Sequence, residues 1–321
     1  MFDRALQKSQ RWLGDASARM ALRCANMGVV NRRLMRSHDR ALSRHRNKLP
    51  ELAGLDLKIV EGLRRDGMYK TSLAELGVPG WQELLREGQA LGATFADDAR
   101  RQSAQGTDYT MVSPDAVAAH PNLFAWGLHD RLLDIVEAYL GVGVAYDGVT
   151  LMYTVAGAPV EGPRRWHLDW EDRRTVKVAV YCNDVSGDGG PFQMIRRKDP
   201  VQGGAGGYHY LLADDALLGA RLGAGYEDDL VSCEGPAGTV LFCETAQYFH
   251  RGKPALKADR VAFFFSYFAR RPRHPFFCER SGLSRSQIAG LARSLNPRQR
   301  ASALWRHGLP LLLRLIPPAG L

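Results

Sequence analysis

Hydrophobic and polar positions follow one spacing in the first part of the chain and another in the second, and the change falls near residue 141. Before it, apolar residues recur at helical intervals, which predicts helices over Asp56–Arg65, Trp81–Leu91 and Leu123–Leu140. Glycine at position 141 suits a helix C-cap. Residues 96–112 are polar and lack this spacing, so we predict a loop that serves either as a lid or as a connector.

After residue 141 the pattern becomes strand-like and remains so for more than a hundred residues. Short β-rich runs are separated by Gly/Pro/Asp turns, as expected of a β-sandwich or barrel. The runs are Val149–Thr154, Val176–Cys182, Phe192–Ile195, Thr239–Phe242 and Val261–Phe268. Residues 202–230 interrupt them, and their glycines lack phosphate-loop spacing, which predicts an insertion between strands. The expected fold is mostly β, with helices on its N-terminal side.

The two ends of the chain differ from the middle in charge. Residues 1–48 hold twelve Lys/Arg against three acids, and residues 270–321 hold ten Arg against one Glu, while the whole chain carries +9. The middle, 49–269, is therefore −9. This asymmetry suggests that the ends meet something anionic, such as a membrane surface, and it does not favour general nucleic-acid binding.

Both ends also carry apolar residues among the arginines. The N-terminal ones, Phe2, Leu6, Leu13, Met20 and Met27, form a helical stripe that either packs on the protein or lies on anionic lipid. The C-terminal ones, Leu304, Trp305, Leu309 and Leu311–Leu313, leave the same two alternatives. No segment has the roughly 20 apolar residues needed to span a bilayer. The five cysteines form no CxxC pair, so we expect a reducing, cytoplasmic location, either free or peripheral on the inner face of the membrane.

Two histidines stand out among nine because of the residues that accompany them. His167 and Asp169 are two residues apart in an extended run, which places both on one face. His250 ends a strand-like segment, and Arg260 begins the next one after a turn. Two histidines and a carboxylate are the ligands that hold non-haem Fe(II) with open positions. The other histidines are expected to be structural: His38, His45, His120, His129, His209, His274 and His307.

Arg260 starts a strand whose two faces differ. Alternation places Arg260, Ala262, Phe264 and Ser266 on one face, which we expect to point into the barrel. The other face carries Val261, Phe263, Phe265 and Tyr267. A buried arginine needs a partner, and a dicarboxylate suits its planar guanidinium. A structural ion pair and an exposed position at the rim are the alternatives for this arginine taken alone.

The ordered set of motifs resembles the phytanoyl-CoA dioxygenase-like family of Fe(II)/2-oxoglutarate oxygenases over residues 55–270. The set is Trp166-His-Leu-Asp169, Val176–Asp184, Gly189–Phe192, His250–Pro254 and Arg260. The resemblance implies a double-stranded β-helix (jelly roll, cupin-like), with its core at about 145–270 inside a domain of residues 49–270. A basic N-terminal arm, 1–48, and a basic helical tail, 271–321, flank that domain.

The resemblance also implies an activity and its ligands. His167, Asp169 and His250 would bind Fe(II), and Arg260 would hold the distal carboxylate of 2-oxoglutarate. Oxidation of this co-substrate by O2 to succinate and carbon dioxide would then drive hydroxylation of a substrate. Asp169 argues against the halogenating relatives, which lack the carboxylate. Position 262 is alanine and has no hydroxyl to assist carboxylate binding, so Tyr153 or Ser266 is a candidate replacement.

The substrate is suggested only by nearby charge. Candidate contacts are Trp170, Arg173, Arg174, Lys177 and the basic run Arg196, Arg197 and Lys198, although each alone also suits solvated surface. Together they favour an anionic substrate, either lipid-linked or at a membrane surface, with the Kdo sugar of lipopolysaccharide as one candidate. A fatty acyl-CoA and a soluble metabolite are alternatives. A non-catalytic jelly-roll protein that binds a membrane or polyanion is the rival from another class.

Overall fold

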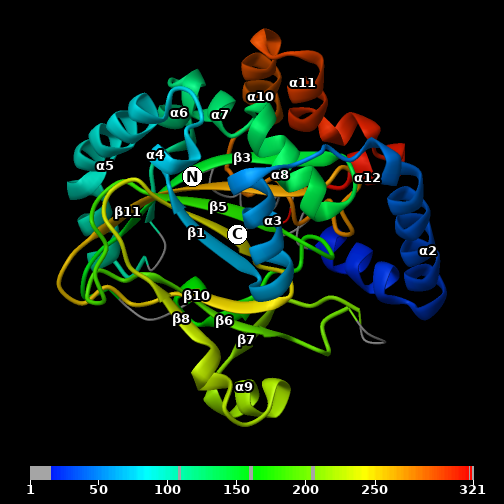
Figure 1. The fold of residues 1–321 in the computed structure, drawn as a ribbon, viewed down its shortest axis with the longest axis horizontal. Helices are drawn as coiled ribbons and strands as arrows, with labels where there is room; N and C mark the ends of the chain where they lie inside the picture. The colour runs from blue at the N-terminus through cyan, green and yellow to red at the C-terminus, as the bar shows by residue number, and fades with distance from the viewer. Residues whose placement is uncertain (1–15, 108–109, 159–161, 204–206, 318, 320–321) are drawn as a thin grey trace, which may run out of the picture.

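The protein is built on two antiparallel sheets that face each other in a double-stranded β-helix (Figure 1). The computed structural model describes residues 16–107, 110–158, 162–203, 207–317 and 319. The larger sheet has the order β1 (Met68–Ser72), β9 (Thr239–Glu244), β5 (Val176–Tyr181), β11 (Arg260–Ala269), β3 (Val144–Thr154) and β2 (Thr110–Met111). The smaller has the order β7 (Leu211–Ala213), β4 (Trp166–Leu168), β10 (Tyr248–Gly252), β6 (Phe192–Lys198) and β8 (Leu230–Cys233). This confirms the predicted fold.

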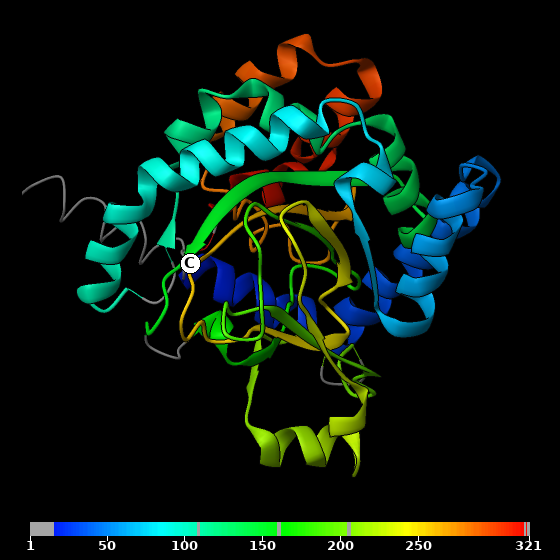
Figure 2. The same cartoon turned by 60° about the vertical axis from the view of Figure 1, so that its left-hand side comes forward.

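Helices cover the outer face of the larger sheet, and α5 crosses it in Figure 2. They are α3 (Gly54–Asp66), α4 (Leu73–Leu76), α5 (Trp81–Ala104), α6 (Pro114–Ala118), α7 (Pro121–Trp126) and α8 (Asp130–Leu140). Helix α2 (Gly28–His45) lies in the N-terminal region, and the C-terminal region contains α10 (Arg285–Leu291), α11 (Pro297–Ala303) and α12 (Leu311–Leu315). Helix α9 (Asp215–Leu222) lies beside the smaller sheet. Short 3-10 turns are η1 (Arg46–Lys48), η2 (Gly162–Arg164), η3 (Tyr226–Asp229), η4 (Ala292–Ser294) and η5 (Trp305–Gly308).

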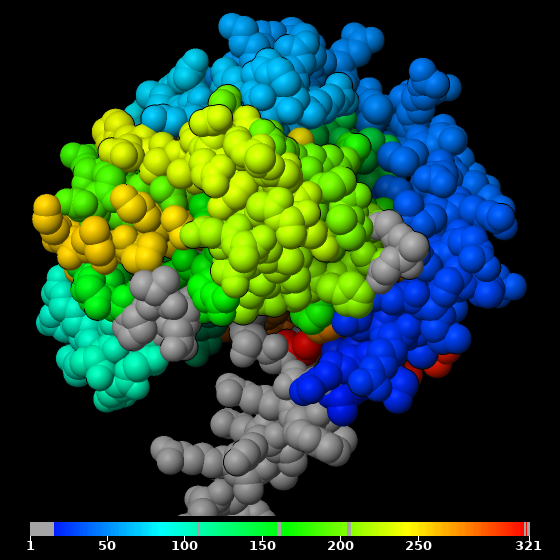
Figure 3. All heavy atoms as spheres, turned by 90° about the horizontal axis from the view of Figure 1, so that it is seen from below, coloured from blue at the N-terminus to red at the C-terminus, as the bar shows by residue number. Residues whose placement is uncertain are grey.

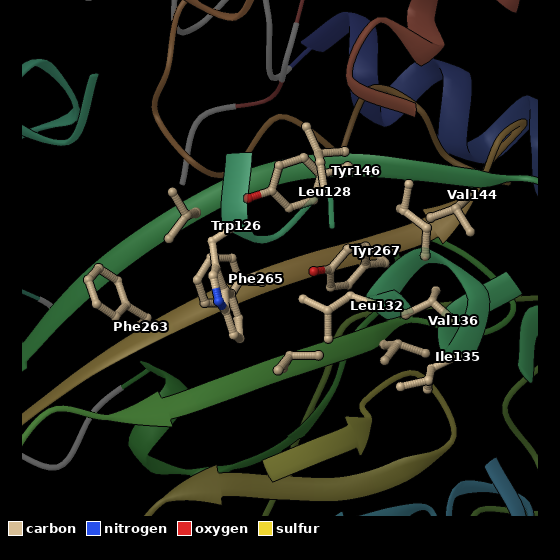
Figure 4. Packing of buried hydrophobic residues seen from close by; sticks show 14 of the residues in the cluster. Trp126, Leu128, Leu132, Ile135, Val136, Val144, Tyr146, Phe263, Phe265 and Tyr267 are labelled. Atoms are coloured by element: carbon tan, nitrogen blue, oxygen red, sulfur yellow. The ribbon is translucent and has the colours of Figure 1, made fainter. Parts of the chain in front are cut away.

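Strand β11 separates the hydrophobic core from the interior of the β-helix. Its outward residues Phe263, Phe265 and Tyr267 are fully buried against the helices (Figure 4). Its inward residues Arg260, Phe264 and Ser266 line a cavity between the sheets. The period-2 alternation predicted from the sequence therefore assigns both faces correctly.

Helix α5 corrects the prediction of a loop over residues 96–112. It runs without a break from Trp81 to Ala104. Its contact face uses glycine: a Cβ at Gly88 would lie 2.4 Å from a Phe263 ring carbon, and one at Gly92 would lie 2.8 Å from a Val261 methyl. Glycine is not counted as hydrophobic, so the face of α5 that packs on the sheet could not be recognised from the spacing of apolar residues.

The predicted helix over 123–140 is two helices, α7 and α8. They are separated at Gly127, where a Cβ would lie 2.5 Å from the Tyr146 hydroxyl oxygen. The chain therefore bends where it comes closest to the sheet. The predicted cap at Gly141 is confirmed, and α3 ends in the same way at Gly67, since both glycines adopt left-handed C-cap conformations with φ of 75° and 73°.

The described parts of the N- and C-terminal regions pack together. A helix through residues 16–26 packs Ala21 and Leu22 into the same cluster as Ile316 and Ala319. Trp305 and Leu309 are buried against β3 and β11, so this part of the tail packs on the protein. The predicted positions Phe2, Leu6 and Leu13 lie outside the described residues. Among the described helices, none is long and apolar enough to cross a membrane.

The insertion predicted between strands at 202–230 contains β7, α9 and η3 where it is described. It projects from the smaller sheet and forms the foremost part of the face drawn in Figure 3. Leu218 and Leu222 of α9 pack with Trp166 and Phe249 behind the smaller sheet. The insertion is thus anchored on the outer side of strands β4 and β10, which carry the two histidines.

Candidate metal and co-substrate site

His167 and His250 face each other on neighbouring strands. They are direct partners in the register of β4 and β10, and their ring centroids are 4.2 Å apart. Asp169 follows β4, where its backbone N–H donates to the carbonyl of Thr245 at 2.9 Å. One ligand atom from each of the three side chains lies within 4.8 Å of the others. All three residues are buried.

Both imidazoles are oriented by the backbone two residues before them. His167 Nδ1 lies 2.9 Å from the carbonyl oxygen of Arg165, and His250 Nδ1 lies 3.1 Å from that of Tyr248. A carbonyl oxygen can only accept, so each Nδ1 carries the proton and each Nε2 keeps a lone pair. This is the tautomer of a metal-binding histidine whose other nitrogen is held by a carbonyl group. Burial lowers the pKa of both imidazoles, which favours the neutral form that binds metal.

Asp169 supplies the negative charge of the site. Burial alone would raise the pKa of its carboxyl, but the Lys177 ammonium, His250 and His167 outweigh burial and lower it. Oδ2 of Asp169 lies 2.6 Å from Lys177 Nζ and 3.8 Å from His250 Nε2. An ionised carboxylate and two neutral imidazoles with free Nε2 atoms match the donor set of non-haem iron. The residues present therefore fit a ferrous ion.

Arg260 lies at one end of the cavity and is buried. Its guanidinium donates to Thr154 Oγ1 at 3.1 Å and to the carbonyl of Gly190. Gly252 leaves room for it, because a Cβ there would stand 3.1 Å from Arg260 Nη2. The rim position considered for this arginine is therefore excluded, and its inward orientation suits a carboxylate held between the guanidinium and Thr154.

Tyr153 and Ser266, the two residues predicted to assist Arg260, both line its cavity, but neither is its register partner. Tyr153 donates its hydroxyl to Asp259 at 2.8 Å, and its ring packs edge-on against Phe95 of α5. Ser266 lines the same cavity, but it is six residues from Arg260 along β11, about 20 Å at 3.4 Å per residue. Thr154, the register partner of Arg260, supplies the hydroxyl instead.

Of the predicted substrate contacts, the structure brings Lys177 to the cavity. Arg173 is tied to Asp172 and to the carbonyl of Leu34, and Arg174 to the carbonyl of Tyr139. Arg197 pairs with Asp229 at the base of the insertion. These side chains are used to join segments of the protein. Exposed Arg196 and Lys198 and half-buried Trp170 are absent from the cavity lining, although Trp170 lies 5.7 Å from Tyr210, whose ring is 5.8 Å from His167.

Sequence reasoning missed a group of cavity residues at the end opposite Arg260: Asp147, Gly148, Glu171, Arg280 and Ser281. Arg280 and Ser281 belong to the predicted tail, 271–321, which is hydrogen-bonded to the cavity wall at Asp147. Buried Asp147 accepts the backbone N–H groups of Glu279 and Arg280 at 2.6 and 2.8 Å. The Arg280 guanidinium also donates to Glu171 at 2.6 Å. No local sequence pattern identifies these tail residues as part of the cavity. The available signal was that Asp147 and Glu171, once buried, require hydrogen-bond donors, which residues 279 and 280 provide.

The cavity that joins these two ends contains about 1050 Å³ of empty space, including its opening. Both histidines of the pair line this cavity, so a metal held by them would face its interior.

No protein-family model matches the chain, and no curated protein matches it. Solved structures with a similar fold include EctD from S. alaskensis with bound Fe, at 18% identity and a TM-score of 0.45, covering 74% of this chain and 87% of that one. Another is the epimerase SnoN in complex with Fe3+, alpha ketoglutarate and nogalamycin RO, at 16% identity and a TM-score of 0.42, covering 75% and 92%. AviO1 from Streptomyces viridochromogenes Tue57 is similar at 17% identity and a TM-score of 0.38, covering 67% and 96%.

Proposed function

We propose that this protein is an Fe(II)/2-oxoglutarate-dependent dioxygenase that hydroxylates an anionic substrate. One observation carries the proposal: two buried Nε2 lone pairs and one ionised carboxylate converge, and the opposite nitrogen of each imidazole is fixed by a backbone carbonyl. A purely structural histidine pair would have no need of a tautomer that leaves both acceptor nitrogens facing a carboxylate.

In this proposal the chain's own residues prepare the reaction. His167, His250 and Asp169 hold the metal, which with 2-oxoglutarate and O2 supplies the oxidising chemistry when it is bound. Arg260 and Thr154 hold the distal carboxylate, so that the keto-acid end points toward the metal. Phe192 lies 5.7 Å from the His250 ring, and with Phe264 it narrows the access of water along this wall.

Anaerobic titration with Fe(II) and then 2-oxoglutarate tests the proposal. The expected result is the weak visible charge-transfer band of an iron–keto-acid chelate, followed in air by succinate formation. His167→Ala and His250→Ala should lose the band, because each removes a ligand. His209→Ala, an exposed histidine outside the cavity lining, is the matched control and should keep it. A wild-type protein that gives neither band nor succinate would support the rival, a non-catalytic binding protein.

The substrate class is supported by the charge of the cavity. Four cations (Arg164, Lys177, Arg260 and Arg280) line it together with two carboxylates, Asp147 and Glu171. We propose that the substrate is anionic and lipid-linked, with a Kdo-containing lipid as one candidate and a fatty acyl-CoA as the alternative. Mass spectrometry of envelope lipids and metabolites from a deletion strain tests this, since loss of the enzyme should remove one oxygen from the product.

A further inference from the structure

The end of the cavity opposite Arg260 has the composition of an anion site. Lys177 and Ser266 are register partners on β5 and β11, and Arg280 and Ser281 reach the same end from the segment after β11. Lys177 touches Asp169, so this end adjoins the metal ligands. A co-substrate held between the metal and Arg260 extends the other way along β11 and leaves this end open.

The hydroxyl of Ser281 is the clearest sign that something binds here. The side chain is 4% exposed, and its Oγ makes no hydrogen bond in the described structure. Facing it is Gly148, with a φ of 118°, where a Cβ would lie 2.9 Å from that oxygen. A buried hydroxyl without a partner costs about 1–3 kcal/mol, so a bound polar group at this position would satisfy it.

Charge gives the sign of that group. Adding Asp169 to the lining leaves four cations against three carboxylates. A divalent metal and dianionic 2-oxoglutarate cancel each other, so the loaded site keeps a formal charge of +1. A metal on Asp169 would share the carboxylate whose Oδ2 lies 2.6 Å from Lys177 Nζ. Glu171 is the other carboxylate that acts on this ammonium, but it is already paired with Arg280 at 2.6 Å, so a further anion beside Lys177 would be favourable.

We infer that Lys177, Arg280 and Ser281 form a subsite for a carboxylate or phosphate group of the substrate. This inference rests on the proposed function and extends it, because it fixes where the substrate's anion lies relative to the metal. Lys177 supplies an ammonium and Ser281 a hydroxyl donor. Arg280 remains paired with Glu171 at 2.6 Å and contributes its charge at the edge of the subsite.

Calorimetric titration of the protein loaded with Fe(II) and 2-oxoglutarate, without oxygen, tests the subsite. The probes are propionate, inorganic phosphate and the neutral isostere propionamide. Either anion should bind at millimolar concentration, and propionamide should not. Ser281→Ala removes one unpartnered hydroxyl and should weaken anion binding about three- to tenfold, and Lys177→Met should weaken it more than tenfold. Arg86→Met, which removes an exposed cation of α5 outside the cavity lining, should have no effect.

The outcomes separate the two proposals. If the chelate band forms and anions bind equally well to wild type, Ser281→Ala and Lys177→Met, the subsite is overturned and the proposed function stands. Binding of propionamide as tight as that of propionate would overturn it as well. If the band does not form in the wild type, the proposed function fails, and the subsite fails with it.

A second inference rests on the surface where the described parts of the N- and C-terminal regions pack together. Helix α2 has no buried residue, and Arg32, Arg36, Arg40 and Arg44 recur on it every four residues, all exposed. Its single acid is Asp39. The opposite face touches the protein, for example where His45 Nε2 lies 2.6 Å from Glu137. The arginines therefore form an outward stripe that nothing in the described structure covers.

Exposed apolar side chains lie on the same side of the molecule. Leu311, Leu312 and Leu315 of α12 are 69%, 79% and 70% exposed, and Figure 1 places α12 near α2. Ile316 joins α12 to the helix through 16–26, which itself exposes Met20. Leucines and arginines together suit the interface of an anionic bilayer, where the leucines enter the headgroup region and the arginines meet phosphate.

We propose that this end surface, α2 with α12 and the helix through 16–26, binds anionic lipid membranes. Co-sedimentation of the full chain with vesicles of phosphatidylcholine, with and without 30% phosphatidylglycerol, tests it. Binding should need the anionic lipid. It should fall at least tenfold both in Arg36→Gln/Arg40→Gln and in Leu311→Ser/Leu312→Ser/Leu315→Ser. Arg86→Gln/Arg101→Gln on α5 is the control and should bind like wild type.

Two results would overturn the membrane proposal. The first is no binding to the anionic vesicles. The second is binding that the triple leucine variant retains in full while duplex DNA competes for it, since that pattern belongs to a nucleic-acid surface. High salt should weaken wild-type binding, because the arginines act through screened charges.

Discussion

The two faces of strand β11 differ in role: one packs in the hydrophobic core and the other lines the cavity, although their residues alternate along ten positions. The outer face places Phe263, Phe265 and Tyr267 in the core beneath the helices. The inner face places Arg260, Phe264 and Ser266 in the cavity. A substitution on the outer face should therefore lower the stability of the fold, whereas one on the inner face, a single residue away, should change ligand binding.

Phe263→Ala and Phe264→Ala should separate these consequences most clearly. Phe263 is fully buried, so truncation should lower the free energy of unfolding by about 3–5 kcal/mol. Phe264 lines the cavity and is half-buried, so its truncation should cost less and should change ligand binding instead. Urea unfolding and the Fe(II)/2-oxoglutarate titration measure the two effects. Equal destabilisation by both variants would contradict the assignment of the faces.

Glu244, at the end of the neighbouring strand β9, extends the comparison to a buried polar group on the core side. It accepts hydrogen bonds from Tyr139 Oη at 2.8 Å and from the backbone N–H of Ala246 at 2.8 Å. Burial, only partly offset by these donors, raises the pKa of Glu244 from 4.5 to about 7. The folded protein therefore binds more protons than the unfolded chain between these values. This contribution to stability is present below about pH 4.5 and is lost as the pH rises through about 7.

Glu244→Gln should remove that pH dependence, because glutamine imitates the protonated carboxyl. Relative to the variant, the wild type should lose about 3 kcal/mol of unfolding free energy between pH 4.5 and pH 8. Denaturation at several pH values measures it. A constant difference between the two proteins across this range would show that Glu244 stays ionised in the fold.

Arg260→Met tests the inner face at its co-substrate end. Loss of the charged hydrogen bonds should raise the dissociation constant for 2-oxoglutarate about 10- to 100-fold, since hydrogen bonds to charged groups contribute about 1.5–3 kcal/mol. The dissociation constant for Fe(II) alone should remain within a few-fold of wild type, because Arg260 is not among the metal ligands. Equal loss of both affinities would mean that Arg260 supports the fold of the site and does not bind the co-substrate.

The alternation of β11 and the residues near it were predictable because pleating is a local property. The Thr154 hydroxyl beside Arg260 was not predictable from the sequence. Tyr153 and Thr154 are adjacent, and only the register of β3 against β11 decides which of them faces inward. Arg280 and Ser281 could not be found either, since backbone hydrogen bonds to the distant Asp147 bring them to the cavity. Sequence patterns therefore located the residues that share a strand, and the resemblance supplied the pairing of His167 with His250. The contacts of Thr154, Arg280 and Ser281, which depend on other pairings between distant segments, were missed.

The same limit explains helix α5 and gives the smallest of the expected effects. Gly88 packs on the outer face of β11, and a Cβ there would lie 2.4 Å from Phe263 and 2.6 Å from the Cys182 sulfur. Gly88→Ala should therefore destabilise the protein by about 1–3 kcal/mol through overpacking, despite the better helix propensity of alanine. Gly219→Ala is the matched control: Gly219 is also within a helix, α9, but its Cβ would meet no atom within 4 Å. That substitution should stabilise by up to about 1 kcal/mol. If thermal unfolding showed that both variants gain stability, α5 would not pack on the sheet through its glycines. The contacts of Gly88 and Gly92 would then not explain why the helix is longer than the apolar spacing predicts.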